Sequence, residues 1–313
     1  MKNLIVRISN EFGNQMFMYA SSLSIAKKMK RSLLIDEESA YLTKKNISKF
    51  GLNNFKLKSK YASDKYKFLG IWGYLKRKFL KKIDRFKNNK LFYIEKKGKA
   101  KITHFQNELF IDNILDNIFL EGHFETEKYF IDIRDIILNE FSFMNEDKFK
   151  NSPFYNDLIK SNSVAICLRQ NRFNEGKKNI SRQNLISSDQ FVREQITYIN
   201  KSIDYFKNKI SSPKFFLWSN DINNIDVSLF CNNIIKVVHN NQFTKDIDLR
   251  ALNLFLLSKC SNHIVIPSSY NWWGAWMNRS KNKCVLRPSD SFFSNFKINN
   301  QDFWPVDWIE IKK

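Results

Sequence analysis

The sequence predicts an α/β protein built from two α/β halves, and three observations support this class. Short apolar runs of strand length alternate with longer segments whose apolar residues recur at helical spacing. This alternation occurs twice, once at the start of the chain and again after residue 163. At 313 residues and 43 % apolar content, the chain can bury two cores. We therefore expect domains at residues 1–152 and 153–313, divided near the polar segment 151–153.

The first half opens on a strand, a helix and a second strand. Leu4 to Ile8 is a short apolar run, Asn14 to Met29 has helical spacing, and Ser32 to Asp36 has the composition of a strand. A glycine-containing turn at residues 12–14 precedes the helix, which predicts a right-handed crossover with a ligand-binding turn at a strand's carboxyl end. A further amphipathic helix is expected from Thr126 to Phe141.

The segment from Lys56 to Lys101 is strongly basic, with seventeen Lys or Arg residues against three acids. Within it, apolar residues at helical spacing predict a basic amphipathic helix: Phe68, Trp72, Leu75, Phe79, Ile83 and Phe86, interleaved with Lys76, Arg77, Lys78, Lys81, Lys82 and Arg85. Two interpretations stay open. The apolar stripe packs onto its own domain, or it contacts an anionic membrane surface.

The second half repeats the alternation. Strands are expected at Val164 to Arg169, Phe215 to Trp218, Ile234 to Val238, His263 to Ile266 and Cys284 to Arg287, with helices from Asp189 to about Ile210 and from Ile247 to Lys259. Polar residues follow several of these strands. Polar residues at strand ends build crevices, so this pattern predicts a binding site.

The composition of the chain limits the kinds of partner that it is expected to bind. The formal charge of +21 would attract nucleic acid, anionic lipid or phosphorylated ligands, although an overall Lys-rich composition also accounts for part of it. No nucleic-acid-binding module is recognisable, so nucleic acid is the least favoured partner. The four cysteines, Cys167, Cys231, Cys260 and Cys284, form no C-x-x-C pair, which is typical of reduced, buried thiols in a cytosolic protein. With neither a signal peptide nor a spanning segment, we expect a cytoplasmic protein, with peripheral contact at the anionic inner face of the membrane as the second interpretation.

Metal chemistry finds little support in the sequence. The chain lacks a P-loop, a G-x-G-x-x-G motif, an H-E-x-x-H motif and zinc spacing, and its four histidines stand alone. Asp246 and Asp248 match a D-x-D metal pattern, but they precede a predicted helix, where acids cap the exposed amides. We expect the capping role and no metal ion.

Residues at the strand ends can bind a diphosphate instead. Arg169 ends a predicted strand, and an arginine there can grip a diphosphate with two parallel hydrogen bonds. Ser268 and Ser269 open a helix whose first amides can hold phosphate oxygens. The competing interpretation of Arg169 is an ion pair at the surface.

The same segments resemble glycosyltransferase family 11, the α-1,2-fucosyltransferases. The resemblance rests on Gly13-Asn14-Gln15-Met16-Phe17, Glu121 to Phe130, Leu254 to Cys260, the Trp-Trp-Gly-Ala-Trp block within Ser268 to Asn278, and Trp304-Pro305-Val306-Asp307-Trp308. It implies two Rossmann-like domains in a GT-B-like architecture, with the acceptor at the N-terminal domain and the donor at the C-terminal domain. It also implies an inverting, metal-independent transfer of L-fucose from GDP-fucose to a galactose-type 2-hydroxyl. A lipid-carried oligosaccharide of a bacterial surface polysaccharide is the acceptor that it suggests.

The resemblance also implies site residues. Arg169 corresponds to the arginine that grips the donor diphosphate, and Glu175 is the nearest carboxylate that could serve as general base. The expected donor-binding residues are Gly13, Asn14, Gln15, Cys167, Arg172, Asp221, Asn253, Ser268, Ser269 and Tyr270.

Six substitutions depart from the family pattern. Cys167 replaces a histidine, Gln170 an arginine, Arg172 an aspartate, Asn220 and Asn253 one aspartate each, and Asn10-Glu11 a glycine pair. Three hypotheses stay open: an active transferase of fucose or of another GDP-deoxysugar; a non-catalytic relative that binds glycan or nucleotide, which the substitutions suggest; and a nucleic-acid-binding protein, which only the charge suggests. The intact Arg169 and the intact Trp-rich block favour the first.

Overall fold

The computed structural model describes residues 2–41, 49–98, 103–175, 177, 179–297 and 299–313. It divides into two compact units: unit 1 is Met1–Met144 with Gln301–Pro305, and unit 2 is Asn145–Asn300 with Val306–Lys313. The division at Met144 precedes the predicted one at residues 151–153. The short helix α4 (Glu146–Lys150) belongs to unit 2, where Phe149 packs against Phe255 with ring centroids 5.5 Å apart.

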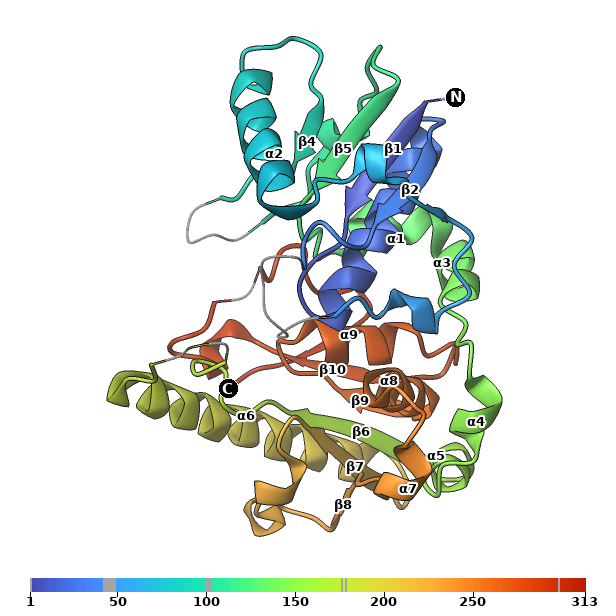
Figure 1. Cartoon of the computed structure of the whole chain (residues 1–313). Helices are drawn as coiled ribbons and strands as arrows, with labels where there is room; N and C mark the ends of the chain where they lie inside the picture. The colour runs from blue at the N-terminus through green and yellow to red at the C-terminus, as the bar shows by residue number, and fades with distance from the viewer. Residues whose placement is uncertain (1, 42–48, 99–102, 176, 178, 298) are drawn as a thin grey trace. The chain divides into compact units, whose positions relative to one another are not determined.

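Within the described residues, unit 1 contains a sheet of five parallel strands in the order β3-β2-β1-β5-β4 (Figure 1). The strands are β1 (Asn3–Arg7), β2 (Ser32–Asp36), β3 (Lys60–Tyr61), β4 (Phe92–Ile94) and β5 (Asn117–Glu121). The predicted strand, helix and strand at the start of the chain are confirmed as β1, α1 (Phe12–Lys28) and β2. Fourteen of the seventeen residues of α1 are buried, because its apolar and small side chains pack against β1 and β2.

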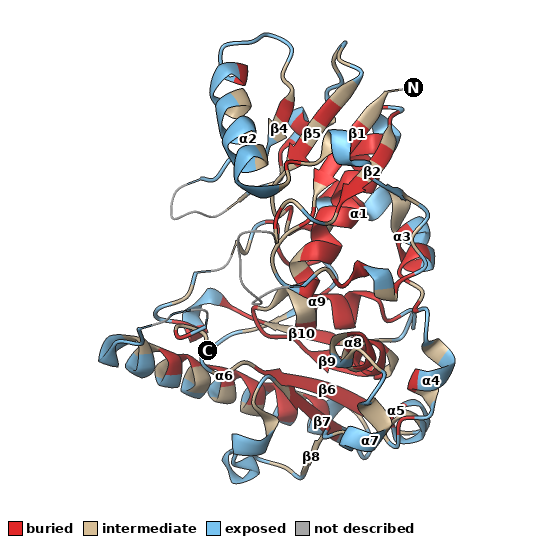
Figure 2. Cartoon of the chain, in the orientation of Figure 1, coloured by how far each residue is buried: buried red, intermediate tan, exposed pale blue. Residues whose placement is uncertain are grey.

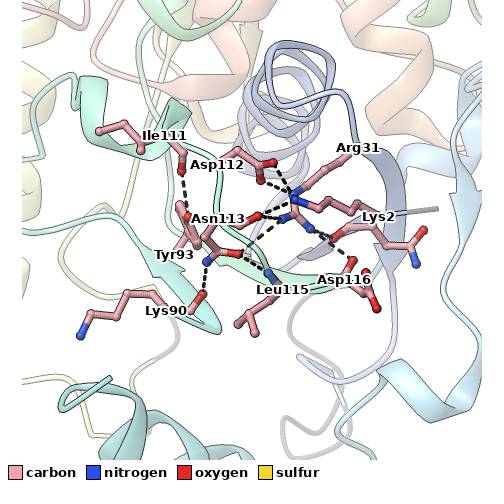
Figure 3. A network of polar contacts seen from close by, with 10 residues as sticks. Lys2, Arg31, Lys90, Tyr93, Ile111, Asp112, Asn113, Leu115 and Asp116 are labelled. Carbon is pink, nitrogen blue, oxygen red and sulfur yellow. Dashed lines mark hydrogen bonds and ion pairs between the residues drawn. The ribbon is translucent and has the colours of Figure 1, made fainter. Parts of the chain in front are cut away.

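A buried arginine ties the amino ends of three strands together (Figure 3). The side chain of Arg31, which precedes β2, donates to Asp112 Oδ1 at 2.6 Å and to the carbonyls of Asn3 and Asp116 at 3.2 Å each. Lys2 adds a hydrogen bond to the carbonyl of Asn113 at 2.6 Å. This network satisfies a guanidinium that is fully shielded from solvent, and it closes the end of the sheet opposite to the strands' carboxyl ends.

The two helices expected later in unit 1 have different outcomes. The basic helix is confirmed as α2 (Gly70–Asp84), although residues 99–101 of the basic segment lie outside the described residues. The single helix expected from Thr126 to Phe141 is wrong. The chain forms two short 3-10 helices and then α3 (Arg134–Glu140), because the backbone leaves helical geometry at Phe130, with φ −137° and ψ 8°.

In unit 2, the described residues form six parallel strands in the order β11-β10-β9-β6-β7-β8. The strands are β6 (Ser163–Leu168), β7 (Lys214–Ser219), β8 (Ile234–Lys236), β9 (Asn262–Ile264), β10 (Val285–Pro288) and β11 (Ile309–Ile311). The remaining helices are α5 (Tyr155–Lys160), α6 (Arg182–Lys209), α7 (Asn241–Thr244), α8 (Leu249–Lys259) and α9 (Ser269–Trp276). In Figure 2 the burial concentrates in the strands and in α1, α8 and α9. The predicted α/β class is therefore confirmed, with two parallel sheets.

The structure also bears on two further expectations, the burial of the cysteines and the absence of a membrane-spanning segment. Of the four cysteines, all of them free, Cys167 and Cys260 are buried as expected, and Cys284 is half-buried. Cys231 is exposed, so its assignment as a buried thiol is wrong; it follows a short 3-10 helix on a polar connection. No helix formed by the described residues is both long and apolar enough to cross a membrane.

Candidate functional site

The sheet of unit 2 changes its order of connection between β6 and β9. From β6 the chain proceeds to β7 and β8 on one side, whereas β9, β10 and β11 lie on the other side. Helices therefore leave the carboxyl ends of β6 and β9 in opposite directions, which opens a crevice in folds of this class. The residues that follow β6 and β9 are Arg169 and the segment before α9, as the sequence predicts.

Arg169 is held by two neighbours. Its backbone N–H donates to Gln195 Oε1 at 3.0 Å, and its carbonyl accepts from Gln195 Nε2 at 2.9 Å. Gln195 lies on α6 and is fully buried. The guanidinium of Arg169 donates two hydrogen bonds to the carboxylate of Glu175, the first from Nε at 3.2 Å. A fork that binds both oxygens of a carboxylate has the geometry that also binds two phosphate oxygens.

The assignment of Glu175 as general base stays a prediction. In this structure, its carboxylate is the counter-ion of Arg169. Arg172 lies 4.0 Å from the same carboxylate, and its guanidinium carbon lies 5.2 Å from the centre of the Phe296 ring. The loop after β6 thus brings its three predicted charged residues together, with Arg169 and Arg172 around the carboxylate of Glu175.

The next strand end is joined to this loop. Gln170 N–H donates to Asn220 Oδ1 at 2.8 Å, and Asn220 Nδ2 donates back to the Gln170 carbonyl at 3.1 Å. The side chain of Gln170 also donates to the carbonyl of Asp221 at 2.7 Å. Gln170 and Asn220, which both depart from the family pattern, are therefore hydrogen-bonded to each other between the ends of β6 and β7.

The segment before α9 presents the start of a helix at the crevice. Ser268 is the N-cap residue of α9, and its side chain makes no capping hydrogen bond. The Trp residues that follow are all buried, and Trp272 stacks on Trp276 with ring centroids 5.9 Å apart. A Cβ added at Gly274 would lie 2.9 Å from Leu257 Cβ, so this glycine allows α9 to approach α8. The Trp-rich block is thus core packing that fixes the position of Ser268 and Ser269.

Three other predicted donor residues are occupied with internal contacts. Cys167 is buried, and its sulfur accepts from Asn271 Nδ2 at 3.0 Å; burial raises the pKa of this thiol. Asn253 Oδ1 lies 2.8 Å from His239 Nε2. The hydroxyl of Tyr270 donates to the Arg250 carbonyl at 2.6 Å. All three side chains are therefore paired within unit 2 in this structure.

Of the two aspartates of the D-x-D pattern, Asp248 acts as expected for a helix start. Asp248 is the N-cap residue of α8, and its Oδ1 accepts from Arg250 N–H at 2.9 Å. The Arg250 guanidinium also pairs with Asp248 at 2.7 Å. Among the described residues, no three His, Cys, Asp or Glu side chains gather as a metal-binding group. The capping role is confirmed for Asp248.

Unit 1 has its own change of strand order, between β1 and β5. Asn10, which follows β1, adopts φ 65°, and its Nδ2 lies 3.2 Å from His123 Nε2 in the turn after β5. Since an amide nitrogen only donates, His123 Nε2 accepts this hydrogen bond. Burial, and then the charge of Lys97, lowers the pKa of His123, which favours the neutral ring.

The predicted N-terminal loop is mostly internal. Gln15 is fully buried, donates to the carbonyls of Asn10 and Lys49 at 2.8 and 2.9 Å, and accepts from Gly51 N–H at 2.9 Å. Its side chain therefore orders the loops around the β1 end and does not face an open cleft. Gly13 is also buried, whereas Asn14 is half-buried.

Sequence reasoning missed the carboxylate of Glu95, which shapes the turn after β5. Glu95 Oε2 accepts from His123 N–H at 2.7 Å and from Phe124 N–H at 3.1 Å. Phe124 adopts φ 54°, and a Cβ at Gly122 would lie 2.5 Å from Glu95 Cβ. A non-glycine residue in the left-handed region costs free energy, so the buried carboxylate stabilises a strained turn. Burial raises the pKa of Glu95 despite these hydrogen bonds.

Comparison with known proteins gives consistent results. A family model described as Glycosyl transferase family 11 matches residues 2–312. The O-antigen biosynthesis glycosyltransferase WbnK of Escherichia coli is 27 % identical over 312 residues, which cover 95 % of this chain and 98 % of that protein. An alpha-1,2-colitosyltransferase of Escherichia coli is 22 % identical over 327 residues, covering all of both chains.

Solved structures share the fold. The crystal structure of the fucosyltransferase NodZ from Bradyrhizobium superposes with a TM-score of 0.51 at 14 % identity, covering 88 % of this chain and 92 % of NodZ. A structure of NodZ alpha-1,6-fucosyltransferase co-crystallised with GDP gives a TM-score of 0.53 at 14 % identity, covering 88 % and 91 %. At these identities, the likeness is one of fold, and it agrees with the predicted GT-B-like architecture.

Proposed function

This chain belongs to glycosyl transferase family 11, and from that membership we propose that it moves L-fucose from GDP-fucose to a galactose-type 2-hydroxyl of a glycan. The reaction is inverting, needs no metal ion, and serves the synthesis of a bacterial surface polysaccharide. The names of the relatives support this choice, since one acts in O-antigen biosynthesis and the other makes a 1,2 linkage. The neighbours in fold are fucosyltransferases, one of them co-crystallised with GDP.

One observation carries the proposal: Arg169 and the start of α9 follow adjacent strands of one parallel sheet. A guanidinium and a helix N-terminus both favour negative charge, and phosphates bind at helix N-termini in many α/β proteins. The β6 and β9 ends of unit 2 are therefore the proposed site of the GDP diphosphate, and unit 1 is the proposed acceptor domain.

In the proposed reaction, the acceptor oxygen forms a bond to the anomeric carbon of fucose. The bond from that carbon to the β-phosphate oxygen breaks, and GDP leaves with the electron pair. Arg169 stabilises the charge that develops on GDP. The acceptor proton passes to a carboxylate, for which Glu175 is the sequence-based candidate; its oxygens become available once the diphosphate replaces them on Arg169.

A donor other than GDP-fucose is the second candidate. One relative is a colitosyltransferase by name, and colitose is fucose without its 3-hydroxyl. Cys167 and Asn253 are neutral where the family pattern has a histidine and an aspartate, so the donor contacts of this chain differ from those of the pattern. A site that hydrogen-bonds a hydroxyl rejects an analogue that lacks it by about 10⁴-fold or more, whereas a site without that contact discriminates far less.

The test is a donor panel. The purified protein is incubated with galactose-terminated oligosaccharides and with GDP-fucose, GDP-colitose or GDP-mannose, with and without EDTA, and the products are analysed by NMR. We expect an α-1,2-linked fucoside whose yield does not change with EDTA. Loss of turnover that manganese restores would contradict the metal-independent reaction, and release of GDP only from GDP-colitose would support the second candidate.

Arg169→Ala tests the site itself. Removing one charge-assisted contact to the leaving group should lower kcat by roughly a hundredfold. Arg193→Ala, which removes an exposed arginine on α6, is the matched control and should retain full activity. Turnover of Arg169→Ala within a factor of about two of the wild type would place the diphosphate elsewhere, because a leaving-group contact is worth far more than that.

A further inference from the structure

Helix α2 displays its apolar side chains to solvent. Trp72, Phe79 and Phe86 are 83 %, 63 % and 87 % exposed, and Leu75 and Ile83 are also exposed. Four of these residues, at positions 72, 75, 79 and 83, follow helical spacing in α2, and Phe86 lies in the turn just past its end; we term the five together the outward stripe. Phe68, the remaining member of the predicted stripe, is buried against Phe92 and Phe119. Figure 2 shows α2 coloured as exposed over most of its length.

The opposite side of α2 is fixed to unit 1. Arg77 and Lys81 donate to the carboxylate of Glu121 on β5, the latter at 2.8 Å. Asp84, the one buried residue among the fifteen described residues of α2, accepts from the N–H groups of Leu91 and Phe92 at 2.7 and 2.9 Å.

Gly73 lies on this same fixed face. A Cβ added there would lie 2.3 Å from the carbonyl carbon of Phe68, so this glycine lets the segment that enters α2 pack closely against the first turn of the helix. Rotating α2 to bury the outward stripe would break the Glu121 and Asp84 contacts. The interpretation that the stripe packs onto its own domain is therefore wrong for all its members except Phe68.

Cations flank the outward stripe. Lys76, Lys78, Lys82, Arg85 and Lys87 are all exposed. In the part of the chain that the structure describes, none of these five forms an ion pair, in contrast to Arg77 and Lys81. By helical spacing, Lys76 lies on one flank of α2 and Lys78 and Lys82 lie on the other, whereas Arg85 and Lys87 follow the end of the helix.

We propose that α2 docks on the surface of an anionic lipid bilayer, with the outward stripe in the headgroup region and the flanking cations on lipid phosphates. Exposed aromatic and aliphatic side chains flanked by cations match a layer that is apolar inside and negatively charged at its surface. A second copy of this chain is a poorer partner, because pairing two stripes would bring about ten unpaired cations together. The docking places unit 1 at the interface where a lipid-carried acceptor would be presented.

The experiment is co-sedimentation with vesicles, either of phosphatidylcholine alone or of equal parts phosphatidylglycerol and phosphatidylcholine. The wild-type chain should bind only the anionic vesicles at 0.1 M salt. Its partition coefficient should fall at least tenfold at 1 M salt, because the Debye length shortens from about 10 Å to about 3 Å. No donor or acceptor is present, so the result is independent of the proposed transferase activity.

Two variants and two matched controls complete the design. The stripe variant carries Trp72→Ser, Phe79→Ser and Phe86→Ser, and its control changes three apolar residues that are exposed elsewhere: Ile111→Ser, Ile114→Ser and Val306→Ser. The charge variant carries Lys76→Ser, Lys78→Ser, Lys82→Ser and Arg85→Ser, and its control changes exposed lysines of unit 2: Lys160→Ser, Lys201→Ser, Lys207→Ser and Lys281→Ser. Arg77 and Lys81 stay unchanged because they hold the helix in place.

Both variants should lose at least tenfold in partition, and both controls should bind as the wild type does. If the wild-type chain does not co-sediment with anionic vesicles at 0.1 M salt, the proposal is overturned. Equal loss in variants and controls also overturns it, because that result would indicate general charge attraction. A dimer in light scattering that only the stripe variant dissociates would assign the stripe to self-association, and binding of RNA without binding of vesicles would assign the cations to nucleic acid.

Discussion

Arg169 holds a carboxylate in the geometry that a diphosphate would need. The guanidinium donates two hydrogen bonds to Glu175, and the backbone of Arg169 is fixed by the buried Gln195. A carboxylate and a phosphate compete for the same N–H groups of the guanidinium. The diphosphate of a bound GDP-sugar would therefore have to displace Glu175 from Arg169. Glu175 should therefore lower the affinity for the GDP-sugar, in addition to any role as the base that accepts the acceptor's proton.

Glu175→Gln separates these two roles. If Glu175 occupies the place of the diphosphate, removing its charge should lower KM for the GDP-sugar by about two- to fivefold, because an ion pair this exposed is worth about 0.2–1 kcal/mol. Because Glu175 is also the candidate general base of the proposed reaction, we expect kcat to fall as well, by about 10²–10⁴-fold. A kcat within a factor of about two of the wild type would leave Glu175 the counter-ion role alone. Glu146→Gln is the matched control, since Glu146 is also 37 % exposed and pairs with a cation of unit 2.

Which site residues the sequence reveals depends on how each one acts. Arg169 directly follows β6, and Ser268 lies in the short segment between β9 and α9, so the apolar strand pattern points to both of them. Gln195 and Glu95 act on backbone groups that lie 26 and 28 residues away, and no spacing rule encodes that contact. Gln195 carried one usable signal, because it is a polar residue on the buried face of α6. Gln15 was expected to face the cleft and is instead buried, since its motif position does not reveal its burial.

At the scale of elements, α1 and α2 show what periodicity can and cannot specify. Both have helical spacing, but α1 is buried on nearly every side and α2 on almost none. The sequence does not predict β5, an inner strand between β1 and β4, because its five residues alternate half-buried and buried and two of them are Asn117 and Glu121. The polar end of that strand is what holds α2 through Arg77 and Lys81.

The attachment of α2 should depend on pH. Burial alone would raise the pKa of Glu121, but the hydrogen bonds and charges of Arg77 and Lys81 hold it below the ordinary value of 4.5. A carboxyl with a lowered pKa stabilises the folded form above its unfolded pKa, and that stabilisation is lost as pH falls through the folded value. Hydrogen-exchange protection factors of α2, corrected for intrinsic rates, should therefore decrease below about pH 4.5.

Glu121→Gln should reproduce the acid result at neutral pH. Hydrogen bonds to charged groups are worth about 1.5–3 kcal/mol, so protection in α2 should fall by roughly tenfold or more and then change little with pH. Glu108→Gln removes an exposed ion pair with Lys96 in the same unit and should leave α2 unchanged. Equal protection of α2 in both variants would show that the Asp84 contacts suffice to hold the helix.

At the scale of the whole molecule, a late segment of the chain completes the early unit. Asp302 lies 3.0 Å from His104 Nδ1, pairs with Lys128, and accepts from Phe105 N–H at 3.3 Å, all within unit 1. The chain then returns to unit 2, where Trp308 packs on Trp272 at 5.6 Å and β11 joins the sheet. The predicted boundary treats each unit as one continuous stretch, because composition carries no sign of such a return.

Two truncations should destabilise different units. A chain that ends at Pro305 keeps unit 1 complete and loses β11, so calorimetry should show a lower melting temperature for unit 2 alone. A chain that ends at Asn300 also loses the Asp302 contacts, and unit 1 should lose about 1–3 kcal/mol as well. Hydrogen exchange assigns each transition to its unit. Identical unit 1 protection in the two truncations would contradict a stabilising role for residues 301–305.

The return of residues 301–305 to unit 1 also bears on synthesis at the ribosome. Residues 145–300, which are 300 − 144 = 156 residues, are translated between the end of the first stretch of unit 1 and its final segment. At about 5–20 residues per second, this takes roughly 8–30 seconds. During that interval, the ring of Phe17 lacks its neighbour Phe303, and the Lys128 ammonium lacks Asp302. A nascent chain stalled before residue 301 should therefore present unit 1 to chaperones in an incomplete form, even though its sheet has long been available to assemble.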